Sequence, residues 1–367
     1  MAKREKLLPL KFDDYERLRN YQLLIVDEFS FLRPDLFDAM DSRLRQVREC
    51  DAPFGGLILL VLGDPFQLPP VILRDEMPDL KKEYGENLHF LSAKVSQKLI
   101  AENQIAVVEL HEIYRQQEVN FLEHLHSIRY GSEVSRREAF DFFNEHCYLG
   151  GEIDPEAITL AFTRMAVAEE NSLSIKRLEN SGRIDPMFDL FQDRLVFVME
   201  HGDSEYERSK SRYPVEIIPY IGMHVMMLDN DSRGRWVNGS IAKIVSADAN
   251  GIAITLCREG DDRIHHVDRV RLYDSSSNIA RQIPLTPCYA ITIHKSQGST
   301  FDRVNINLQR NGSRKLGFEL LYVALSRCKT VEGIRLREPL CINNFKESRG
   351  VVDFYRTLRT YQERMVP

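Results

Sequence analysis

The sequence predicts an α/β protein with parallel sheets and a smaller all-β insertion. Two aliphatic runs, residues 23–26 and 57–62, are each followed by acidic residues and are separated by a helical pattern. This order is the βαβ unit of a parallel sheet, because parallel strands need a crossover connection. Residues 214–285 differ, since they hold short strands punctuated by turn signals, which is typical of a small barrel.

The composition is that of an ordinary globular protein. Hydrophobic residues make up 43% and charged residues 28% of the 367 residues, enough chain for two or three domains. No apolar stretch approaches the roughly 20 residues of a membrane span, so no membrane partner is predicted. The six cysteines lie far apart and form no C-x-x-C pair, which favours reduced thiols and a cytoplasmic (nucleoid) or nuclear location.

The charge is unevenly distributed. The net charge is −6, yet residues 281–367 hold 15 Lys and Arg against 7 Asp and Glu. A basic segment on an acidic body is compatible with a local groove that follows nucleic-acid phosphates. On charge alone, a solvated basic helix face is equally compatible.

The individual elements follow from local pattern. Residues 12–20 predict a short helix that leads into the first strand, and Pro34 begins a helix with an apolar face at helical spacing. Residues 53–56 predict a turn. The later predictions are a strand over 107–114, a helix around 121–128, a strand over 158–163, a helix over 166–178, a surface loop over 202–212, strands over 290–294 and 303–308, and a helix over 319–326.

Asp27 and Glu28 end the first aliphatic run and are the first candidate catalytic residues. A nucleotide hydrolase needs one carboxylate to hold Mg²⁺ through water and one to orient or deprotonate the attacking water. Adjacent residues at a strand's end suit both roles, because ligands of open α/β sheets bind at that edge. An acidic pair that only caps the next helix is the alternative interpretation.

The octet 63–70, Gly-Asp-Pro-Phe-Gln-Leu-Pro-Pro, ends the second aliphatic run. Gly63 and Asp64 place a second polar cluster along the same sheet edge. Gln67 is a neutral side chain between stiff prolines and is predicted to sense a γ-phosphate or the attacking water. A plain proline-rich turn is the alternative, and the unusual octet disfavours it.

Several motifs, in family order, closely resemble those of the Pif/RecD-like helicases of superfamily one. They are Val26-Asp27-Glu28-Phe29-Ser30, the stretch from Pro53-Phe54-Gly55-Gly56 into 63–70, Val237-Asn238-Gly239-Ser240, Ala290-Ile291-Thr292-Ile293-His294-Lys295-Ser296-Gln297-Gly298-Ser299-Thr300, and Tyr322-Val323-Ala324-Leu325-Ser326-Arg327. They cover the chain from about residue 12 to 340 and are jointly highly specific.

The resemblance implies an ATP-dependent DNA helicase that moves 5′→3′ on single-stranded DNA, with ATP and Mg²⁺ as cofactors. Asp27 would hold Mg²⁺ through water, and Glu28 would be the water-activating base. Gln67 would couple the γ-phosphate to the DNA path.

The nucleotide-binding set that the resemblance implies extends to other parts of the chain. Arg115 matches the family's phosphate-contacting arginine, and Arg327 matches the arginine finger of the second RecA-like domain. A guanidinium fork suits the spreading charge of a transferring phosphoryl group. Gly63, Asp64 and Gly298 complete this set, and helix-surface arginines are the alternative for Arg115 and Arg327.

The implied contacts to single-stranded DNA lie late in the chain, where hydroxyls and a cation hold phosphates without reading sequence. The implied residues are Thr292, His294, Lys295, Ser296, Gln297 and Asn238. The alternative interpretations are structural: His294 is equally suited to a buried position at a strand end, and Asn238-Gly239 is suited to a hairpin turn. Trp236 and Tyr322 are candidate base-stacking surfaces, with core packing as the alternative.

The implied architecture is two RecA-like parallel-sheet domains, the first incomplete, with an inserted SH3-like barrel. We expect a partial first domain (1A) over 1–100, a second domain (2A) over 101–195 and 281–367, and the inserted domain (2B) over 196–280.

The family's phosphate loop, G-x-x-x-x-G-K-[ST], has no match, because none of the 19 glycines is followed by Lys. Three hypotheses are open: a fragment of an ordinary helicase, one half of a split enzyme whose partner chain supplies the loop, or a non-catalytic module that binds single strands or protein. A RecD-like subunit of a recombination complex is a further, weaker alternative. In the first two cases, the chain alone is expected to show negligible ATPase activity.

Overall fold

The structure, a computed structural model, divides the chain into two compact units. Unit 1 comprises residues 1–145, 313–330 and 340–367, and unit 2 comprises residues 146–312 and 331–339. The structure describes residues 12–110, 112–180, 197–198, 200–201, 213–214, 216–248, 251–257, 261–273, 279–309 and 315–365. Residues 101–145, 313–330 and 340–367 group with unit 1. The predicted domain limits at 100, 195 and 280 stay a prediction.

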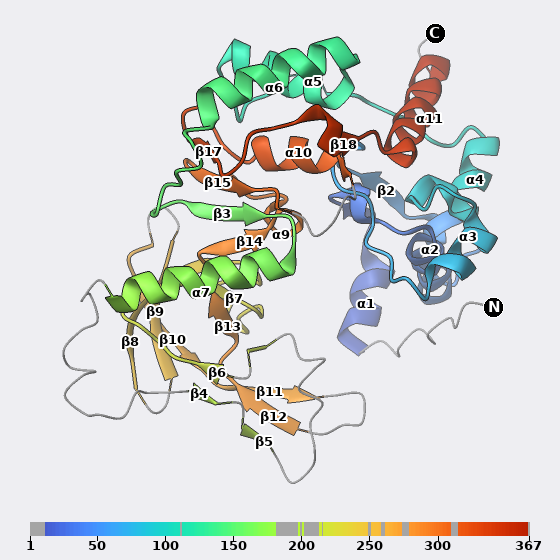
Figure 1. The fold of residues 1–367 in the computed structure, drawn as a ribbon. Coiled ribbons are helices and arrows are strands. Elements are labelled where there is room, and N and C mark those ends of the chain that lie inside the picture. Colours follow the sequence, from blue (N-terminus) through green and yellow to red (C-terminus); the bar gives the residue numbers. More distant parts are fainter. Residues whose placement is uncertain are drawn as a thin grey trace. The chain divides into compact units, whose positions relative to one another are not determined.

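Unit 1 contains the predicted βαβ unit. Strand β1 (Leu23–Val26) pairs in parallel with β2 (Ile58–Val61), and helix α2 (Pro34–Arg48) connects them (Figure 1). One face of the sheet packs on a buried aromatic and aliphatic core that includes Phe37 and Phe90. Aliphatic side chains of the other face and of the residue after β2 are exposed: Leu23, Ile25, Ile58, Leu60 and Leu62.

The remaining elements of unit 1 are mostly helical. Helix α10, which carries Tyr322, packs against α5, so two sequence-distant helices lie side by side (Figure 1). The further elements are α1 (Phe12–Asn20), η1 (Phe29–Phe31), η2 (Pro53–Gly56), α3 (Met77–Tyr84), η3 (Phe90–Ser92), α4 (Lys94–Ala101), α5 (Val119–Tyr130), α6 (Glu133–Cys147, whose end enters unit 2), β16 (Leu316–Gly317), α10 (Phe318–Leu325), η5 (Ile342–Asn344), β18 (Phe345–Lys346) and α11 (Arg349–Met365).

Unit 2 contains a four-stranded parallel sheet in the order β14-β3-β15-β17. Its strands are β14 (Ala290–Thr292), β3 (Ile158–Ala161), β15 (Val304–Asn307) and β17 (Ile334–Leu336). All four residues of β15 are buried, as expected for a strand covered on both faces. Helix α7 (Arg164–Asn180) packs against β3 and β14, and a short helix, α9 (Ile293–Ser296), follows β14 directly.

The rest of unit 2 is antiparallel, as the turn-rich sequence predicts. Five strands form one sheet in the order β10-β9-β8-β7-β13, with Trp236 buried in its core. A closed SH3-like barrel stays a prediction. The strands are β4 (Phe197–Val198), β5 (Glu200–His201), β6 (Glu216–Ile217), β7 (His224–Met227), β8 (Ile241–Ala247), β9 (Gly251–Leu256), β10 (Ile264–Asp268), β11 (Val270–Tyr273), β12 (Ile279–Gln282) and β13 (Leu285–Pro287).

The predicted strand over 107–114 is wrong, since residues 107–110 and 112–114 form no strand. Val108 is 81% exposed and Leu110 is 87% exposed. A strand needs a neighbour to receive its backbone hydrogen bonds, and no strand in the described parts of the chain pairs with this segment. The strand predicted over 290–294 is real but ends at Thr292, because the Thr292 side chain caps α9. The predicted loop over 202–212 lies outside the described residues.

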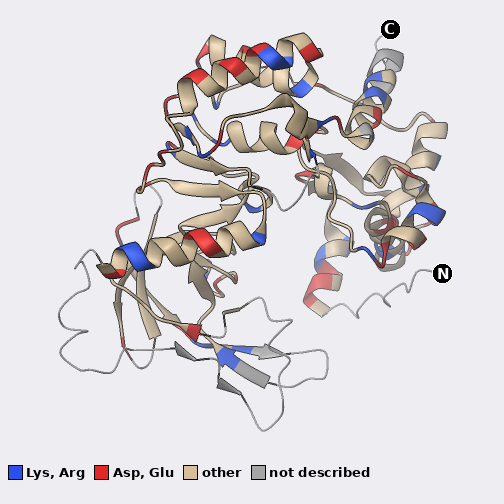
Figure 2. Ribbon diagram, viewed as in Figure 1, with Lys and Arg blue, Asp and Glu red and all other residues tan. Residues whose placement is uncertain are grey.

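Charge is spread over both units. Figure 2 shows acidic and basic residues interspersed on α5, α6 and α7. The basic excess of 281–367 is divided as well, because this segment contributes residues to unit 1 and to unit 2. The excess is therefore not the property of a single helix face. Among the described residues, no helix combines the length and apolarity needed to cross a bilayer.

Candidate functional site

The loops that follow β1 and β2 are joined by backbone hydrogen bonds. The Leu62 N–H donates to the Val26 carbonyl oxygen at 2.8 Å, and the Phe29 N–H donates to the Leu62 carbonyl oxygen at 2.9 Å. A Cβ at Gly63 would lie 2.8 Å from the Phe29 nitrogen, so only glycine allows this approach. Asp27-Glu28 and Gly63-Asp64 therefore leave the sheet side by side, as the sequence predicts.

Glu28 adopts an unusual backbone conformation. Its φ of 56° and ψ of 51° are left-handed, which is uncommon for a residue other than glycine. The Glu28 N–H donates to Asp27 Oδ1 at 2.8 Å, and Asp27 is exposed. Backbone strain of this kind costs about 1–3 kcal/mol and concentrates at functional sites. The turn is thus a local feature in favour of a functional role for the pair.

Asp64 joins the second loop to α5 and α10. Its Oδ1 accepts hydrogen bonds from the Phe66 N–H at 2.9 Å and from Arg129 Nη2, and its Oδ2 accepts one from the Tyr322 hydroxyl at 3.3 Å. The Arg129 guanidinium lies over the rings of Phe66, Tyr130 and Tyr322 at 4.9, 4.6 and 5.3 Å. Burial raises the pKa of Tyr322 to about 12, so its hydroxyl remains a donor at neutral pH.

Gln67 follows in the same loop, and its backbone N–H donates to the Asp64 carbonyl oxygen at 3.1 Å. Its side-chain Oε1 is buried and has no hydrogen-bond partner among the described residues. A buried acceptor without a partner costs free energy, and in native proteins such atoms usually meet water or a ligand. This orphaned oxygen fits the predicted role of Gln67 near a reacting phosphate or water.

Arg327 is a buried cation, with 1% of its surface exposed. Its Nε donates to the Val323 carbonyl oxygen at 3.0 Å, and its Nη2 donates to Ser326 Oγ at 2.9 Å. Burial, and next the nearby positive charge of Arg115, lower the pKa of Arg327 to about 10, while the charge of Glu28 opposes this shift. Two neighbouring guanidinium groups repel each other, so a nearby negative charge such as that of Glu28 stabilises the site.

Arg115 is exposed, and its Nη1 lies 3.4 Å from the Ser326 carbonyl oxygen. The adjacent Gln116 is buried and was not predicted. Its Nε2 donates to the carbonyl oxygens of Ser326 and Cys328, both at 2.9 Å. Gln116 therefore fixes the backbone on both sides of Arg327. Its only sequence signal is its place beside Arg115.

Arg129 is the second residue that the sequence prediction missed. A signal was present, because Arg129 follows Leu125 by four positions, in register with the buried face of α5. A charged residue in an apolar stripe needs a buried partner. The partner, Asp64, is 65 positions away and is identified only by the fold.

The DNA-contact candidates at 292–297 lie at the end of β14 and in α9 of unit 2. Thr292 Oγ1 accepts the Lys295 N–H at 3.3 Å and so caps α9. Lys295 is exposed. Burial lowers the pKa of His294, because it disfavours the charged imidazolium form. Ser296 is fully buried and its hydroxyl donates to the Ile293 carbonyl oxygen at 2.8 Å, so its proposed DNA contact stays a prediction.

The other unit 2 candidates differ in exposure. Asn238 is exposed at the turn between β7 and β8, and its N–H donates to Asn230 Oδ1 at 2.8 Å. Gly298 is exposed with a φ of +79°, which suits glycine. Trp236 is only 5% exposed, in agreement with core packing rather than base stacking. Gln297 follows α9 and is half-buried.

The structure thus groups the predicted residues by unit. Unit 1 holds Asp27, Glu28, Gly63, Asp64, Gln67, Arg115 and Arg327, together with the base-stacking candidate Tyr322. Unit 2 holds Gly298 and the implied DNA contacts at 292, 294–297 and 238. No group of three or more metal-ligating side chains occurs in the parts of the chain that the structure describes.

Comparison with known proteins gives two family matches. The model of the PIF1-like helicase family matches residues 10–138, and that of the UvrD-like helicase C-terminal domain matches residues 287–330. ATP-dependent DNA helicase PIF1 of the mouse is 30% identical over 356 residues, which cover 93% of this chain and 49% of that protein. The chain belongs to the Pif1-like helicases.

Other Pif1 helicases agree with this assignment. The human PIF1 helicase is 28% identical, with 93% of this chain and 50% of the relative covered, and the Pif1 of Bdellovibrio bacteriovorus is 28% identical with 87% and 67% covered. A crystal structure of Pif1 helicase from Bacteroides with ADP-AlF3 and single-stranded DNA matches with a TM-score of 0.79 and 28% identity, covering 98% of this chain and 80% of that chain. The chain spans about half the length of the mammalian Pif1 relatives.

Proposed function

We propose that this chain is the motor part of an ATP-dependent DNA helicase that moves 5′→3′ along single-stranded DNA. The observation that carries the proposal is the pairing of two strand-end loops, which places the acidic pair Asp27-Glu28 beside Gly63-Asp64. The Pif1 homologues support the same activity, since they are ATP-dependent DNA helicases.

Each residue of the unit 1 site has a role in this proposal. A bound ATP would provide the phosphoryl group, and a bound Mg²⁺ would supply charge neutralisation. Asp27 would hold the ion through water, and Glu28 would take the proton of the attacking water. Gln67 orients that water or the γ-phosphate through its orphaned Oε1. Arg115 and Arg327 hold the phosphates, because an added anion relieves the repulsion between the two guanidinium groups.

Single-stranded DNA is the proposed partner of unit 2. Exposed Lys295 provides a positive charge, and Thr292, Gln297 and Asn238 provide polar groups for the phosphate backbone. Burial lowers the pKa of His294, which favours a role as a hydrogen-bonding group over a role as a charge. Bacteroides Pif1, which has been crystallised with single-stranded DNA, supports this assignment.

We propose that the phosphate loop lies outside these 367 residues. It belongs either to the missing part of a longer helicase, of which this chain is a fragment, or to a partner chain. The exposed aliphatic face of β1 and β2 supports this, because a parallel sheet is normally covered on both faces. The chain alone is then expected to hydrolyse ATP negligibly, since no lysine of a phosphate loop reaches the β- and γ-phosphates. We place the protein in the cytoplasm (nucleoid) or nucleus.

The test is ATP turnover by the purified 367-residue chain with and without single-stranded DNA. We expect negligible turnover and salt-sensitive DNA binding. DNA-stimulated turnover that Glu28→Gln abolishes would contradict the proposed need for another polypeptide. Supplying a phosphate-loop polypeptide from a Pif1 relative is expected to restore turnover that requires Glu28 and Arg327.

A non-catalytic module that binds single strands is the second candidate. The lack of a G-x-x-x-x-G-K-[ST] motif favours it. This candidate predicts the same salt-sensitive DNA binding, but ATP has no effect on the affinity and Arg327→Ala leaves it unchanged. An ATP-dependent change in DNA affinity that Arg327→Ala removes would exclude it.

A further inference from the structure

We infer that Asn171, on α7, is a positioning residue for the DNA-contacting segment 292–297. This inference rests on the proposed DNA binding by that segment and adds a residue that the sequence motifs do not include. Asn171 contacts Tyr289 and Ala290 at the start of β14, three and two residues before Thr292 and outside the candidate site itself.

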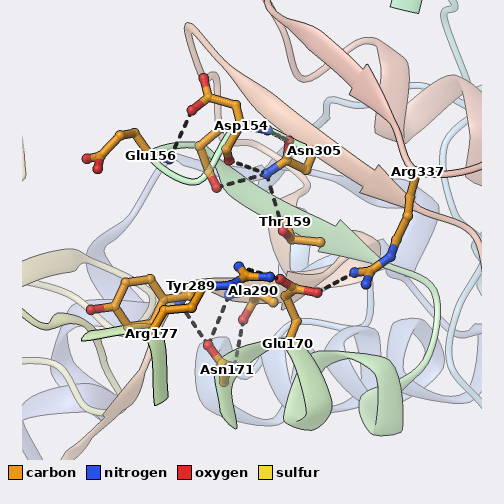
Figure 3. Close-up of polar contacts among 11 residues, drawn as sticks. Asp154, Glu156, Thr159, Glu170, Asn171, Arg177, Tyr289, Ala290, Asn305 and Arg337 are labelled. Atoms are coloured by element: carbon orange, nitrogen blue, oxygen red, sulfur yellow. Dashed lines mark hydrogen bonds and ion pairs between the residues drawn. The ribbon is translucent and has the colours of Figure 1, made fainter. Parts of the chain in front are cut away.

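The contact is a three-bond clamp between one side-chain amide and the backbone. Asn171 Oδ1 accepts hydrogen bonds from the N–H groups of Tyr289 and Ala290, at 2.8 and 3.0 Å. Asn171 Nδ2 donates to the Ala290 carbonyl oxygen at 3.1 Å (Figure 3). The amide thus replaces the peptide group of a neighbouring strand, which matters because β14 is an edge strand of its sheet among the described strands.

The effect of the clamp reaches the proposed DNA contacts through a short stretch of chain. β14 has only three residues, and its last residue, Thr292, caps α9 through the Lys295 N–H. A shift of Ala290 is therefore carried directly to the start of α9. On the other side, β3 holds the same segment, because the Thr159 N–H donates to the Tyr289 carbonyl oxygen at 2.9 Å.

The same junction connects to the antiparallel sheet that carries Asn238. The Cys288 N–H donates to the His224 carbonyl oxygen at 2.8 Å, and the His224 N–H lies 3.4 Å from the Tyr289 hydroxyl oxygen. His224 begins β7, and Asn238 lies in the turn that follows β7. Asn171 therefore helps to set the distance between the two groups of proposed DNA contacts in unit 2.

Helix α7, which carries Asn171, is itself held in place by the ion pairs of a buried carboxylate. The neighbour of Asn171, Glu170, is only 3% exposed and forms ion pairs with Arg337, which follows β17, and with Arg177 at 3.6 Å (Figure 3). A buried carboxylate held by two arginines resists displacement, because losing a partner would leave a buried charge. The clamp thus transmits the position of α7 to the segment 292–297.

Asn144 provides a matched control in the other unit. Its Nδ2 donates to the Leu340 carbonyl oxygen at 3.0 Å, and its Oδ1 accepts the Leu340 N–H at 2.7 Å. This is the same kind of amide-to-backbone clamp on a helix, but it holds residues of unit 1. Asn144→Ala therefore removes similar hydrogen bonds without touching the segment 292–297.

The test measures the affinity of the full chain for fluorescein-labelled oligo(dT) by anisotropy at several salt concentrations. We expect Asn171→Ala to weaken binding about fivefold to tenfold, the size of one or two hydrogen bonds. We expect Asn144→Ala to leave the affinity unchanged. Thermal melting of both variants checks that they are folded at the temperature of the assay.

A double-variant cycle separates positioning from a general loss of stability. If Asn171 acts through the segment 292–297, the double variant Asn171→Ala/Lys295→Ala binds DNA no more weakly than Lys295→Ala alone. In both of these variants, the slope of log affinity against log salt concentration falls by about 0.7, because one phosphate contact is lost. Additive losses, or an unchanged affinity for Asn171→Ala, would overturn the inference. Failure of the wild-type chain or of Lys295→Ala to show the expected binding would instead contradict the proposed function.

Discussion

The parallel sheets of the two units differ in how they are covered. In unit 2, every residue of β15 is buried and Leu160 of β3 has no exposed surface. In unit 1, exposed and half-buried residues alternate along β1 and β2, and Ile58 is 68% exposed. Yet β1 and β2 are entirely aliphatic, which is the pattern of strands buried on both faces. The difference indicates that the site in unit 1 is built on a sheet with a free apolar face.

The largest expected effect comes from the buried ion pair of unit 1. Asp64 and Arg129 each expose 16% of their side chains, so Arg129→Met leaves a carboxylate largely without its counter-charge. We expect a loss of about 3–5 kcal/mol in the free energy of unfolding, measured by urea denaturation. In unit 2, the Arg303 side chain of the Asp154–Arg303 pair is 57% exposed, so Arg303→Met should cost about 0–1 kcal/mol. Equal losses would contradict this contrast.

The two sheets themselves are compared by one pair of matched truncations. Leu160→Ala opens a cavity in the covered sheet and is expected to cost about 2–5 kcal/mol. Leu60 is 43% exposed, so Leu60→Ala should cost less than about 1 kcal/mol. Chemical denaturation of both variants measures the difference. A large loss for Leu60→Ala would show that the free face is covered in the isolated chain.

Two glycine substitutions test the close approach of the strand-end loops. Gly63→Ala forces a Cβ to 2.8 Å from the Phe29 nitrogen, so we expect a loss of about 1–3 kcal/mol and a displaced Asp27-Glu28 turn. At Gly239 in unit 2, φ is +91° but nothing lies within 4 Å of the added Cβ, so Gly239→Ala should cost about 1 kcal/mol. Thermal melting gives the losses, and amide hydrogen exchange at residues 27–30 reports the displacement. Unchanged exchange in Gly63→Ala would argue against the loops being coupled.

The last prediction concerns the pH dependence of unit 1. Burial lowers the pKa of His89, which stacks on Phe354 of α11 at 4.2 Å between ring centroids, to about 4. The unfolded chain, with a pKa of about 6.5, therefore binds more protons, and stability falls as the pH drops from about 6.5 towards 4. Between these pH values, the free energy of unfolding changes by up to about 1.4 kcal/mol per pH unit, the value for one proton. His89→Phe keeps the stack and should remove this part of the slope, so identical pH profiles would refute the assignment.

The local sequence pattern was enough to predict most of the helices and strands and the position of the acidic pair Asp27-Glu28. The helices at 12–20 and from Pro34, both strands of the βαβ unit and the acidic pair at its edge follow from residues near each other in the sequence. The segment 107–114 shows the limit of this reasoning. Its residues favour a strand, but a strand exists only where a neighbour accepts its hydrogen bonds.

The sequence by itself determined the family and the α/β class and predicted the residues of the proposed phosphate site, because each depends on short motifs in a fixed order. Only the tertiary structure decided how those residues are held. Arg129 pairs with Asp64, Gln116 donates hydrogen bonds to the backbone around Arg327, and Asn171 is hydrogen-bonded to the start of β14. These partners are distant in the sequence, and burial decides their energetics. The same burial places Trp236 and Ser296 inside unit 2, where their sequence pattern alone left surface roles open.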